Sequence, residues 1–196
     1  MSKLQRSSGG AARPLVSVLT PTVPIRAAYL AECRASVLAQ TTGAWEHLRI
    51  VDEEGLGCAA VMNQLADAAR GQWLFPLADD DLLLPGCLDT LLAASADADV
   101  VYSPPLVWGR DPAGYQLAPP IIPAPALISR ELWQRLGGYD TEWNREEDRR
   151  LWIRALAAGA RFVRVVSEPT WVYRFHTGNK SLNGGVVPGA QVRVPA

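Results

Sequence analysis

The chain has 196 residues, of which 48% are hydrophobic and 20% charged, and its formal net charge is −1. This composition is ordinary for a globular protein, and the small net charge gives no overall attraction to nucleic acid or to an anionic membrane. The three cysteines have no metal-ligand spacing, and their odd number disfavours a disulfide framework. No apolar stretch approaches the ~18 residues of a transmembrane helix. We therefore expect reduced thiols and a cytoplasmic location.

One domain is expected over residues 14–182, between flexible tails at 1–13 and 183–196. The first tail is polar and lacks the apolar core of a signal peptide. In the first half of the domain, apolar patterns predict strands at 15–19, 47–52, 73–78 and 99–102, with helices at 27–40, 56–70 and 85–94 between them. Repeated strand–helix–strand units predict a doubly wound, mostly parallel sheet that binds ligands at the carboxyl ends of its strands.

Polar residues stand at three of these strand ends. Thr20-Pro21-Thr22 follows the first strand, Asp52 ends the second, and Asp79-Asp80-Asp81 follows the third. Adjacent carboxylates repel one another by up to about 4 kcal/mol at ~4 Å and an effective dielectric of ~20. A divalent hard cation shared with a phosphate-bearing ligand would offset this repulsion. An acidic turn that caps the next helix is the alternative explanation of the triplet.

The second half is less regular. Residues 103–125 hold seven prolines and read as a long ribbon or loop. A helix at 129–136 is expected to end at Gly137-Gly138, and a further helix at 146–158 carries Asp148 in its first turn. Asp148 is expected either to project inward or simply to complement the helix dipole, which would keep it ionised at pH 7. Strand-like runs at 162–166 and 170–175 precede His176.

The order of these motifs resembles the family-2 glycosyltransferases of the GT-A fold. The matching motifs are Thr20-Pro21-Thr22, Asp52, Asn63, the aspartate triplet, Gly137-Gly138-Tyr139-Asp140, Glu147-Asp148 and Tyr173-Arg174-Phe175-His176. Each is weak alone, whereas their order across residues 16–181 is fairly specific. The resemblance implies an α/β GT-A fold with a small acceptor-side subregion, in which 14–103 form the nucleotide-sugar half and 104–182 the acceptor half.

The resemblance also assigns the donor side of the site. It implies that the nucleotide-binding residues are Thr20, Pro21, Thr22, Asp52, Asn63 and Asp79. It implies a metal, Mn²⁺ or Mg²⁺, at Asp80 and His176, although His176 also fits a core histidine bonded to backbone. Many members carry an aspartate where this chain has Ala78, and an arginine where it has Met62. Arg174 and Lys180 are therefore the candidate diphosphate contacts.

On the acceptor side, the resemblance makes Asp148 the catalytic base. One base opposite the leaving group predicts a single displacement with inversion. Candidate acceptor contacts are Trp108, Tyr115, Trp143 and Glu147. The expected activity is that of a hexosyl- or pentosyltransferase, and a UDP-sugar donor is favoured because Asp52 can accept the imide N–H of uracil. The acceptor hydroxyl belongs to a glycan, a small molecule or a modified nucleic acid.

Two other readings of the sequence are open. A nucleotidyltransferase-like enzyme also combines a doubly wound sheet with an acid-bound metal, but it predicts a basic Gly-rich loop where this chain has Thr20-Pro21-Thr22. A catalytically degenerate nucleotide-sugar-binding subunit predicts loss of the base or of the metal ligand, whereas Asp80 and Asp148 are both present.

Overall fold

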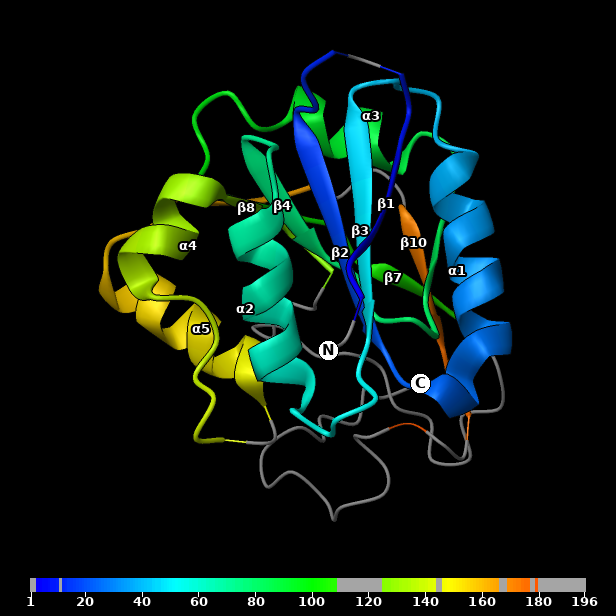
Figure 1. Ribbon diagram of the computed structural model, residues 1–196. Coiled ribbons are helices and arrows are strands. Elements are labelled where there is room, and N and C mark those ends of the chain that lie inside the picture. Colours follow the sequence, from blue (N-terminus) through cyan, green and yellow to red (C-terminus); the bar gives the residue numbers. More distant parts are fainter. Residues whose placement is uncertain are drawn as a thin grey trace, which may run out of the picture.

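The structure, a computed structural model, describes residues 3–10, 12–108, 125–143, 146–165, 169–176 and 179. A seven-stranded sheet of order β1-β3-β2-β4-β8-β6-β9 runs through its centre (Figure 1). Its strands are β1 (Gln5–Ser8), β2 (Val16–Thr22), β3 (Trp45–Val51), β4 (Trp73–Pro76), β6 (Val100–Tyr102), β8 (Leu127–Ser129) and β9 (Phe162–Arg164). Strands β1 and β8 run against the others, so the sheet is mostly parallel, as predicted.

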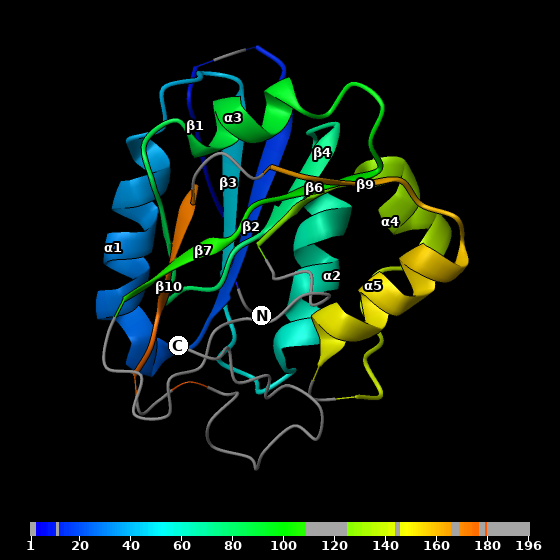
Figure 2. The same cartoon turned by 180° about the vertical axis from the view of Figure 1, so that it is seen from behind.

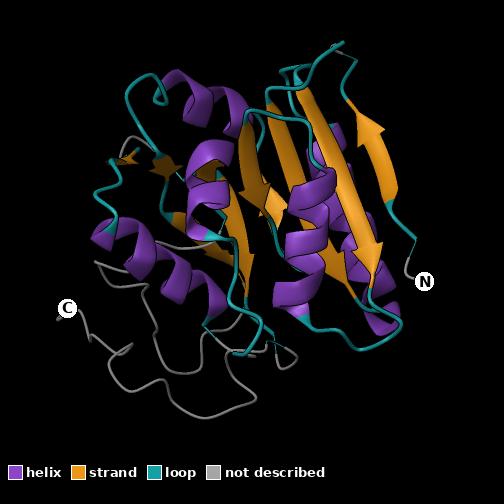
Figure 3. Ribbon diagram, turned by 60° about the vertical axis from the view of Figure 1, so that its left-hand side comes forward, coloured by secondary structure: helices purple, strands orange, loops and turns teal. Residues whose placement is uncertain are grey.

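Helices cover both faces of this sheet (Figure 3). Helices α2 (Cys58–Ala68), α4 (Arg130–Leu136) and α5 (Glu147–Ala157) supply side chains to one core. Helices α1 (Ala27–Leu38) and α3 (Cys87–Ala93) supply the other. Successive strand residues point to opposite faces, so Val16 and Val18 enter the second core while Leu19 enters the first. Burial on both faces explains the nearly continuous apolar runs of these strands.

A second, three-stranded sheet of order β5-β10-β7 lies on the side seen in Figure 2. It consists of β5 (Leu82–Leu83), β7 (Pro105–Trp108) and β10 (Trp171–Arg174). Strand β10 pairs antiparallel with β5 and parallel with β7. Strand β5 begins directly after the aspartate triplet, and β10 is followed by His176. The pairing of β10 with β5 therefore places His176 near the aspartates. Trp171, which is 1% exposed, anchors β10 in the core.

The predicted helices and strands of the first half all form, with ends shifted by a few residues. The helix end at Gly137 is also confirmed, since Gly137 has φ 75° and its N–H bonds to carbonyl groups of the last turn. Ser129 caps the start of α4 by accepting the N–H of Leu132 at 3.2 Å. Within the described ranges, no helix is both long and apolar enough to span a bilayer.

The N-terminal segment differs from the expected flexible tail. Residues 5–8 form β1, which pairs antiparallel with β3. Arg6 reinforces this edge, because its Nε lies 3.2 Å from Glu46 Oε2 and its Nη2 donates to the Ala68 carbonyl at 2.6 Å. The strand is polar because it lies at the sheet edge and is largely exposed, so it has no apolar pattern to reveal it. Tyr115, Lys180 and the tail at 183–196 lie outside the described residues.

Candidate functional site

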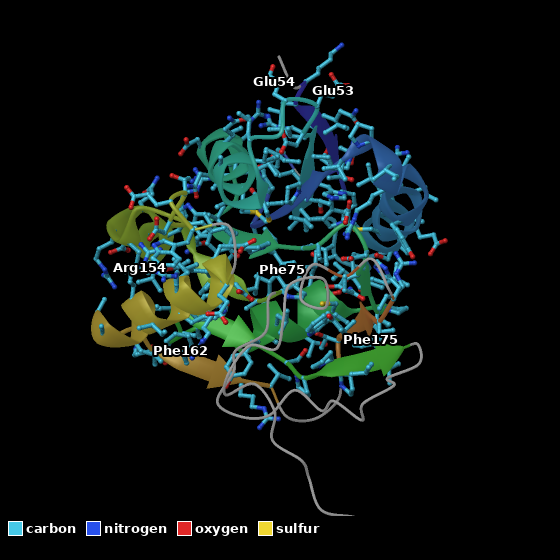
Figure 4. The ribbon with its side chains drawn as sticks, turned by 90° about the horizontal axis from the view of Figure 1, so that it is seen from below. Glu53, Glu54, Phe75, Arg154, Phe162 and Phe175 are labelled. Atoms are coloured by element: carbon cyan, nitrogen blue, oxygen red, sulfur yellow. The ribbon has the colours of Figure 1, made fainter. Side chains whose placement is uncertain are left out.

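The strand ends named by the sequence meet at one edge of the large sheet, seen directly in Figure 4. Glu53 and Glu54, which directly follow β3, lie at the periphery of this edge. Helix α5, which carries Arg154, and strand β10, which precedes Phe175, lie on opposite sides of this edge. Figures 1 and 2 agree that α5 begins beside the beginning of α2. The edge therefore brings together segments from both halves of the chain.

The aspartate triplet is buried at this edge, with exposures of 3%, 6% and 2% for Asp79, Asp80 and Asp81. Asp79 Oδ2 accepts the hydroxyl of Thr22 at 2.5 Å. A single nitrogen, Arg26 Nη1, donates to Asp79 Oδ1 at 2.9 Å and to Asp80 Oδ2 at 2.8 Å. The repulsion among these carboxylates is therefore offset by a cation of the chain itself.

Burial raises the pKa of Asp79, while the bonds from Thr22 and Arg26 oppose this effect without cancelling it. Burial raises the pKa of Asp81 well above its ordinary value, and the charge of Asp80 adds to the effect. Asp81 Oδ1 accepts the backbone N–H of Arg174 at 3.2 Å, which ties the triplet to β10. Asp81 is thus a structural member of the triplet, and Asp79 and Asp80 face the site.

His176 meets Asp80, as the sequence motifs implied. Its Nε2 lies 3.1 Å from Asp80 Oδ2. The imidazole stacks on the ring of Tyr29 at 4.6 Å between centroids and 18° between planes. Asn179 fixes the turn, because its Oδ1 accepts the His176 backbone N–H at 2.5 Å and its Nδ2 donates to the Arg174 carbonyl at 3.1 Å. These contacts hold the imidazole against the carboxylate rather than in the apolar core.

Arg174 takes a different place from that expected of a diphosphate contact. Its guanidinium is enclosed by helix α1, where Nη1 pairs with Glu32 and Cζ lies 4.9 Å from the ring centroid of Tyr29. Its Nε donates to the Asp80 carbonyl. The side chain is only 8% exposed. Arg174 therefore fastens β10 and the aspartate loop to α1.

Thr20 and Asp52 also have partners within the chain. The Thr20 hydroxyl lies 3.0 Å from Nε2 of His47, whose pKa burial lowers to about 3, so this histidine is neutral. Asp52 accepts the backbone N–H of Leu56 at 2.9 Å and that of Gly57 at 2.8 Å. Burial acts to raise the pKa of Asp52, but these N–H groups outweigh it and hold the pKa below its ordinary value. The ionised carboxylate shapes the loop that leads into α2.

Asn63 forms a two-bond clip between α2 and the loop after α4. Its Nδ2 donates to the Tyr139 carbonyl at 2.8 Å, and its Oδ1 accepts the Tyr139 N–H at 2.9 Å. Both functions of the amide are therefore used within the chain. This geometry favours a role in positioning the loop that leads to α5 over the direct nucleotide contact implied by the resemblance.

The two glycines beside this clip give a matched test of it. Gly137 and Gly138 have φ values of 75° and 72°, so alanine strains either position. A Cβ at Gly137 meets nothing within 4 Å, whereas one at Gly138 would lie 2.5 Å from Asn63 Oδ1. We expect Gly137→Ala to lower the free energy of unfolding by about 1 kcal/mol, and Gly138→Ala by at least about 1 kcal/mol more. Urea denaturation measures both, and equal losses would contradict the clip.

Asp148 lies in the first turn of α5 and is half-buried. Protein atoms packed around its carboxylate raise its pKa, the charges of Glu147 and Glu146 add to this, and the N–H of Arg149 opposes it at 2.8 Å. The net shift is upward, because burial outweighs the Arg149 N–H, and the ionisation of Asp148 at pH 7 stays a prediction. Burial raises the pKa of Tyr139 well above its ordinary value, and the charge of Asp148 adds to this effect.

Trp143 precedes α5 in the sequence and is 51% exposed. The guanidinium of Arg150 lies 3.7 Å from its ring centroid, in a cation–π contact. Trp108 ends β7, on the second sheet. Of the predicted acceptor contacts, Trp143 and Glu147 therefore share the segment that bears Asp148.

No protein-family model and no curated protein matches the chain. Solved structures do match it. TarS 1–349 of S. aureus matches with a TM-score of 0.66 and 14% identity, covering 81% of this chain and 60% of that one. Its complex with UDP-GlcNAc matches with a TM-score of 0.69 and 14% identity, covering 88% of this chain and 61% of that one. The mannosyltransferase PcManGT from Pyrobaculum calidifontis, in complex with GDP-Man and Mn²⁺, matches with a TM-score of 0.62 and 18% identity. The match covers 85% of this chain and 58% of that one.

The chain has the GT-A fold. It spans about 60% of the length of the TarS 1–349 structures. The predicted fold is confirmed, and the site described above occupies the ligand-binding edge of a doubly wound sheet.

The carboxylate and imidazole groups at this edge of the GT-A fold can serve as ligands of a divalent cation. In the part of the chain that the structure describes, no three His, Cys, Asp or Glu side chains converge as a ready-made metal site. Asp80 Oδ2 and His176 Nε2 nevertheless converge at 3.1 Å, beside a carboxylate pair that already accommodates the cation of Arg26. Mg²⁺-type ions commonly take one or two protein ligands and complete their shell with water and substrate phosphates. The residues present fit such an ion.

Four residues of this site escaped the sequence motifs, namely Arg26, Tyr29, Glu32 and Asn179. Arg26 could have been found from the sequence, because it is a basic residue a few positions after the strand end Thr20-Pro21-Thr22. It lies in the short 3₁₀ helix η1 (Pro24–Arg26). Tyr29 and Glu32 face β10 through contacts made far along the chain, which no local pattern reveals.

Proposed function

We propose that this chain is a metal-dependent, inverting glycosyltransferase that transfers a sugar from a nucleoside-diphosphate sugar to a hydroxyl acceptor. The observation that carries the proposal is the meeting of Asp79, Asp80 and His176 at the edge of a GT-A fold. Solved neighbours of the same fold contain UDP-GlcNAc in one case, and GDP-Man with Mn²⁺ in another. The strand end Thr20-Pro21-Thr22 leads into a short 3₁₀ helix rather than the Gly-rich loop of a nucleotidyltransferase.

In this proposal, Asp80 and His176 hold a Mn²⁺ or Mg²⁺ ion, which when bound neutralises the charge of the departing diphosphate as a Lewis acid. Asp79, held by Thr22, supports the ribose side of the donor. Asp148 accepts the proton of the acceptor hydroxyl as that oxygen attacks the anomeric carbon. The bond from the anomeric carbon to the diphosphate oxygen breaks as the new glycosidic bond forms on the opposite face.

Trp143 supports a sugar-bearing acceptor, because an exposed indole offers an apolar face on which a sugar ring stacks. Arg150 already covers one face of that ring, so the acceptor would stack on the other face, and we propose a glycan or a glycoside as the acceptor. The free cysteines Cys33, Cys58 and Cys87 suit a reducing compartment, and we place the enzyme in the cytoplasm.

We expect UDP to stabilise the protein more than GDP or CDP does in the presence of Mn²⁺. Asp52 is ionised, and each carboxylate oxygen that accepts a backbone N–H retains a second lone pair for the imide N–H of uracil. Guanine and cytosine present different hydrogen-bonding edges to that position. Thermal-shift measurements with UDP, dTDP, GDP and CDP test this, with dTDP close to UDP because thymine has the same imide. Stabilisation by GDP alone would contradict the assignment.

A further inference from the structure

Arg26 reaches the buried carboxylates from the solvent side. Its side chain is 24% exposed, whereas those of Asp79 and Asp80 are 4% and 8% exposed. One guanidinium nitrogen bridges the two carboxylates, at 2.9 Å and 2.8 Å. The oxygen of Asp80 that it contacts, Oδ2, is the same atom that His176 approaches. Arg26 thus stands where a metal at Asp80 would take its oxygen ligand.

We propose that Arg26 is a resident counter-ion of Asp79 and Asp80 that a divalent cation must displace, so that this arginine sets the metal affinity of the site. The inference rests on the proposed metal at Asp80 and His176. A carboxylate lone pair donated to a metal is no longer available to the guanidinium, and two cations at one oxygen repel each other. Metal binding and the Arg26 bridge therefore compete.

The other arginine at the site provides a contrast. Arg174 is only 8% exposed and is held by Glu32, Tyr29 and the Asp80 carbonyl, so its guanidinium stays in place. Arg26 belongs to the short 3₁₀ helix η1, which contributes no buried residue to the core. Its side chain is 24% exposed, against 8% for Arg174, so of these two guanidinium groups it is the more accessible to solvent and to an incoming cation. A planar guanidinium released beside the metal suits bidentate contact with the oxygens of a diphosphate.

The test is calorimetric titration with Mn²⁺, without and then with UDP, on the wild type and four variants. We expect Arg26→Gln to tighten Mn²⁺ binding in the absence of nucleotide by about fivefold, because both bridging bonds are lost. With Mn²⁺ saturating, the same variant should bind UDP several-fold more weakly. Arg26→Lys, which keeps the charge as a compact ammonium, should fall between Arg26→Gln and the wild type.

Arg161→Gln is the matched control, since it removes one positive charge from a side chain that is 63% exposed and pairs with Asp97 and Asp99 away from the site. It should leave both affinities within about twofold. Asp80→Asn should abolish Mn²⁺ binding. If Asp80→Asn abolishes binding while Arg26→Gln leaves the Mn²⁺ affinity unchanged or weaker, the counter-ion role is wrong and the proposed metal site stands. If Asp80→Asn binds Mn²⁺ like the wild type, the metal site itself is contradicted.

Discussion

Asp148→Asn should lower turnover by at least ~10², because a positioned general base contributes ~10²–10⁴ in rate and the amide cannot accept the proton. Donor affinity should stay within a few-fold, since Asp148 lies on α5 and in this proposal serves the acceptor rather than the donor. Burial raises the pKa of this half-buried carboxylate, so its ionised form lowers stability at neutral pH. The variant should therefore be at least as stable as the wild type, which separates lost catalysis from lost folding.

Glu147→Gln is the matched control, because it changes the neighbouring carboxylate in the same helical turn. It should reduce turnover much less than Asp148→Asn does. The measurement is kcat and donor Kd for both variants, side by side. Near-full turnover in Asp148→Asn, or loss of donor binding instead of turnover, would show that the base lies elsewhere.

The pH profile adds a second readout for the same residue. Burial raises the folded-state pKa of Asp148 above the ordinary aspartate value of 3.8. The base works only when deprotonated, so kcat should fall as pH falls through this raised pKa. Glu147→Gln should move this acidic limb to lower pH, because the charge of Glu147 is one cause of the upward shift.

Asp80→Asn should remove the metal dependence of donor binding. In the wild type, we expect Mn²⁺ or Mg²⁺ to tighten binding of a nucleotide-sugar and EDTA to reverse the effect. Asp80 Oδ2 is the carboxylate oxygen nearest His176 Nε2, and an amide is a far weaker ligand for a hard cation. We expect the variant to lose at least ~10-fold in donor affinity with metal present, because loss of even a group that supports a metal ligand typically costs ~10- to 100-fold.

Asp97→Asn serves as the control for this change, because that side chain is 93% exposed and far from the site. It should bind donor like the wild type. Calorimetric titration with UDP-sugar, with and without chelator, gives both affinities. Equal wild-type affinity in the two conditions would contradict a metal held by Asp80.

The fold was largely predictable because its core strands are apolar over their whole length. Runs such as residues 73–76 are buried on both faces, and their order with the amphipathic helices dictates a parallel sheet. The polar edge strand β1 and the two-residue strand β5 carry no such pattern. Their existence depends on pairing with β3 and β10, which lie far away in the sequence.

Some features of the site were likewise predictable from the sequence, and others were not. Proximity of Asp80 and His176 followed from motif order and is present in the structure. The role of Asn63 in holding the loop after α4 could not be predicted from the sequence. Its partner Tyr139 lies next to it only because that loop packs against α2. The direction of the Asp148 pKa shift also needed the structure, since a helix start and burial act oppositely on a carboxylate.

The central claim is that this chain uses a metal to cleave the bond between a sugar and a nucleoside diphosphate. The most direct test is incubation of the purified protein with a panel of UDP-, dTDP- and GDP-sugars and Mn²⁺, with assay of released nucleoside diphosphate. We predict slow release from at least one UDP-sugar, abolished by EDTA and by Asp80→Asn. Absence of release from every sugar, with no donor binding in the same samples, would contradict the claim.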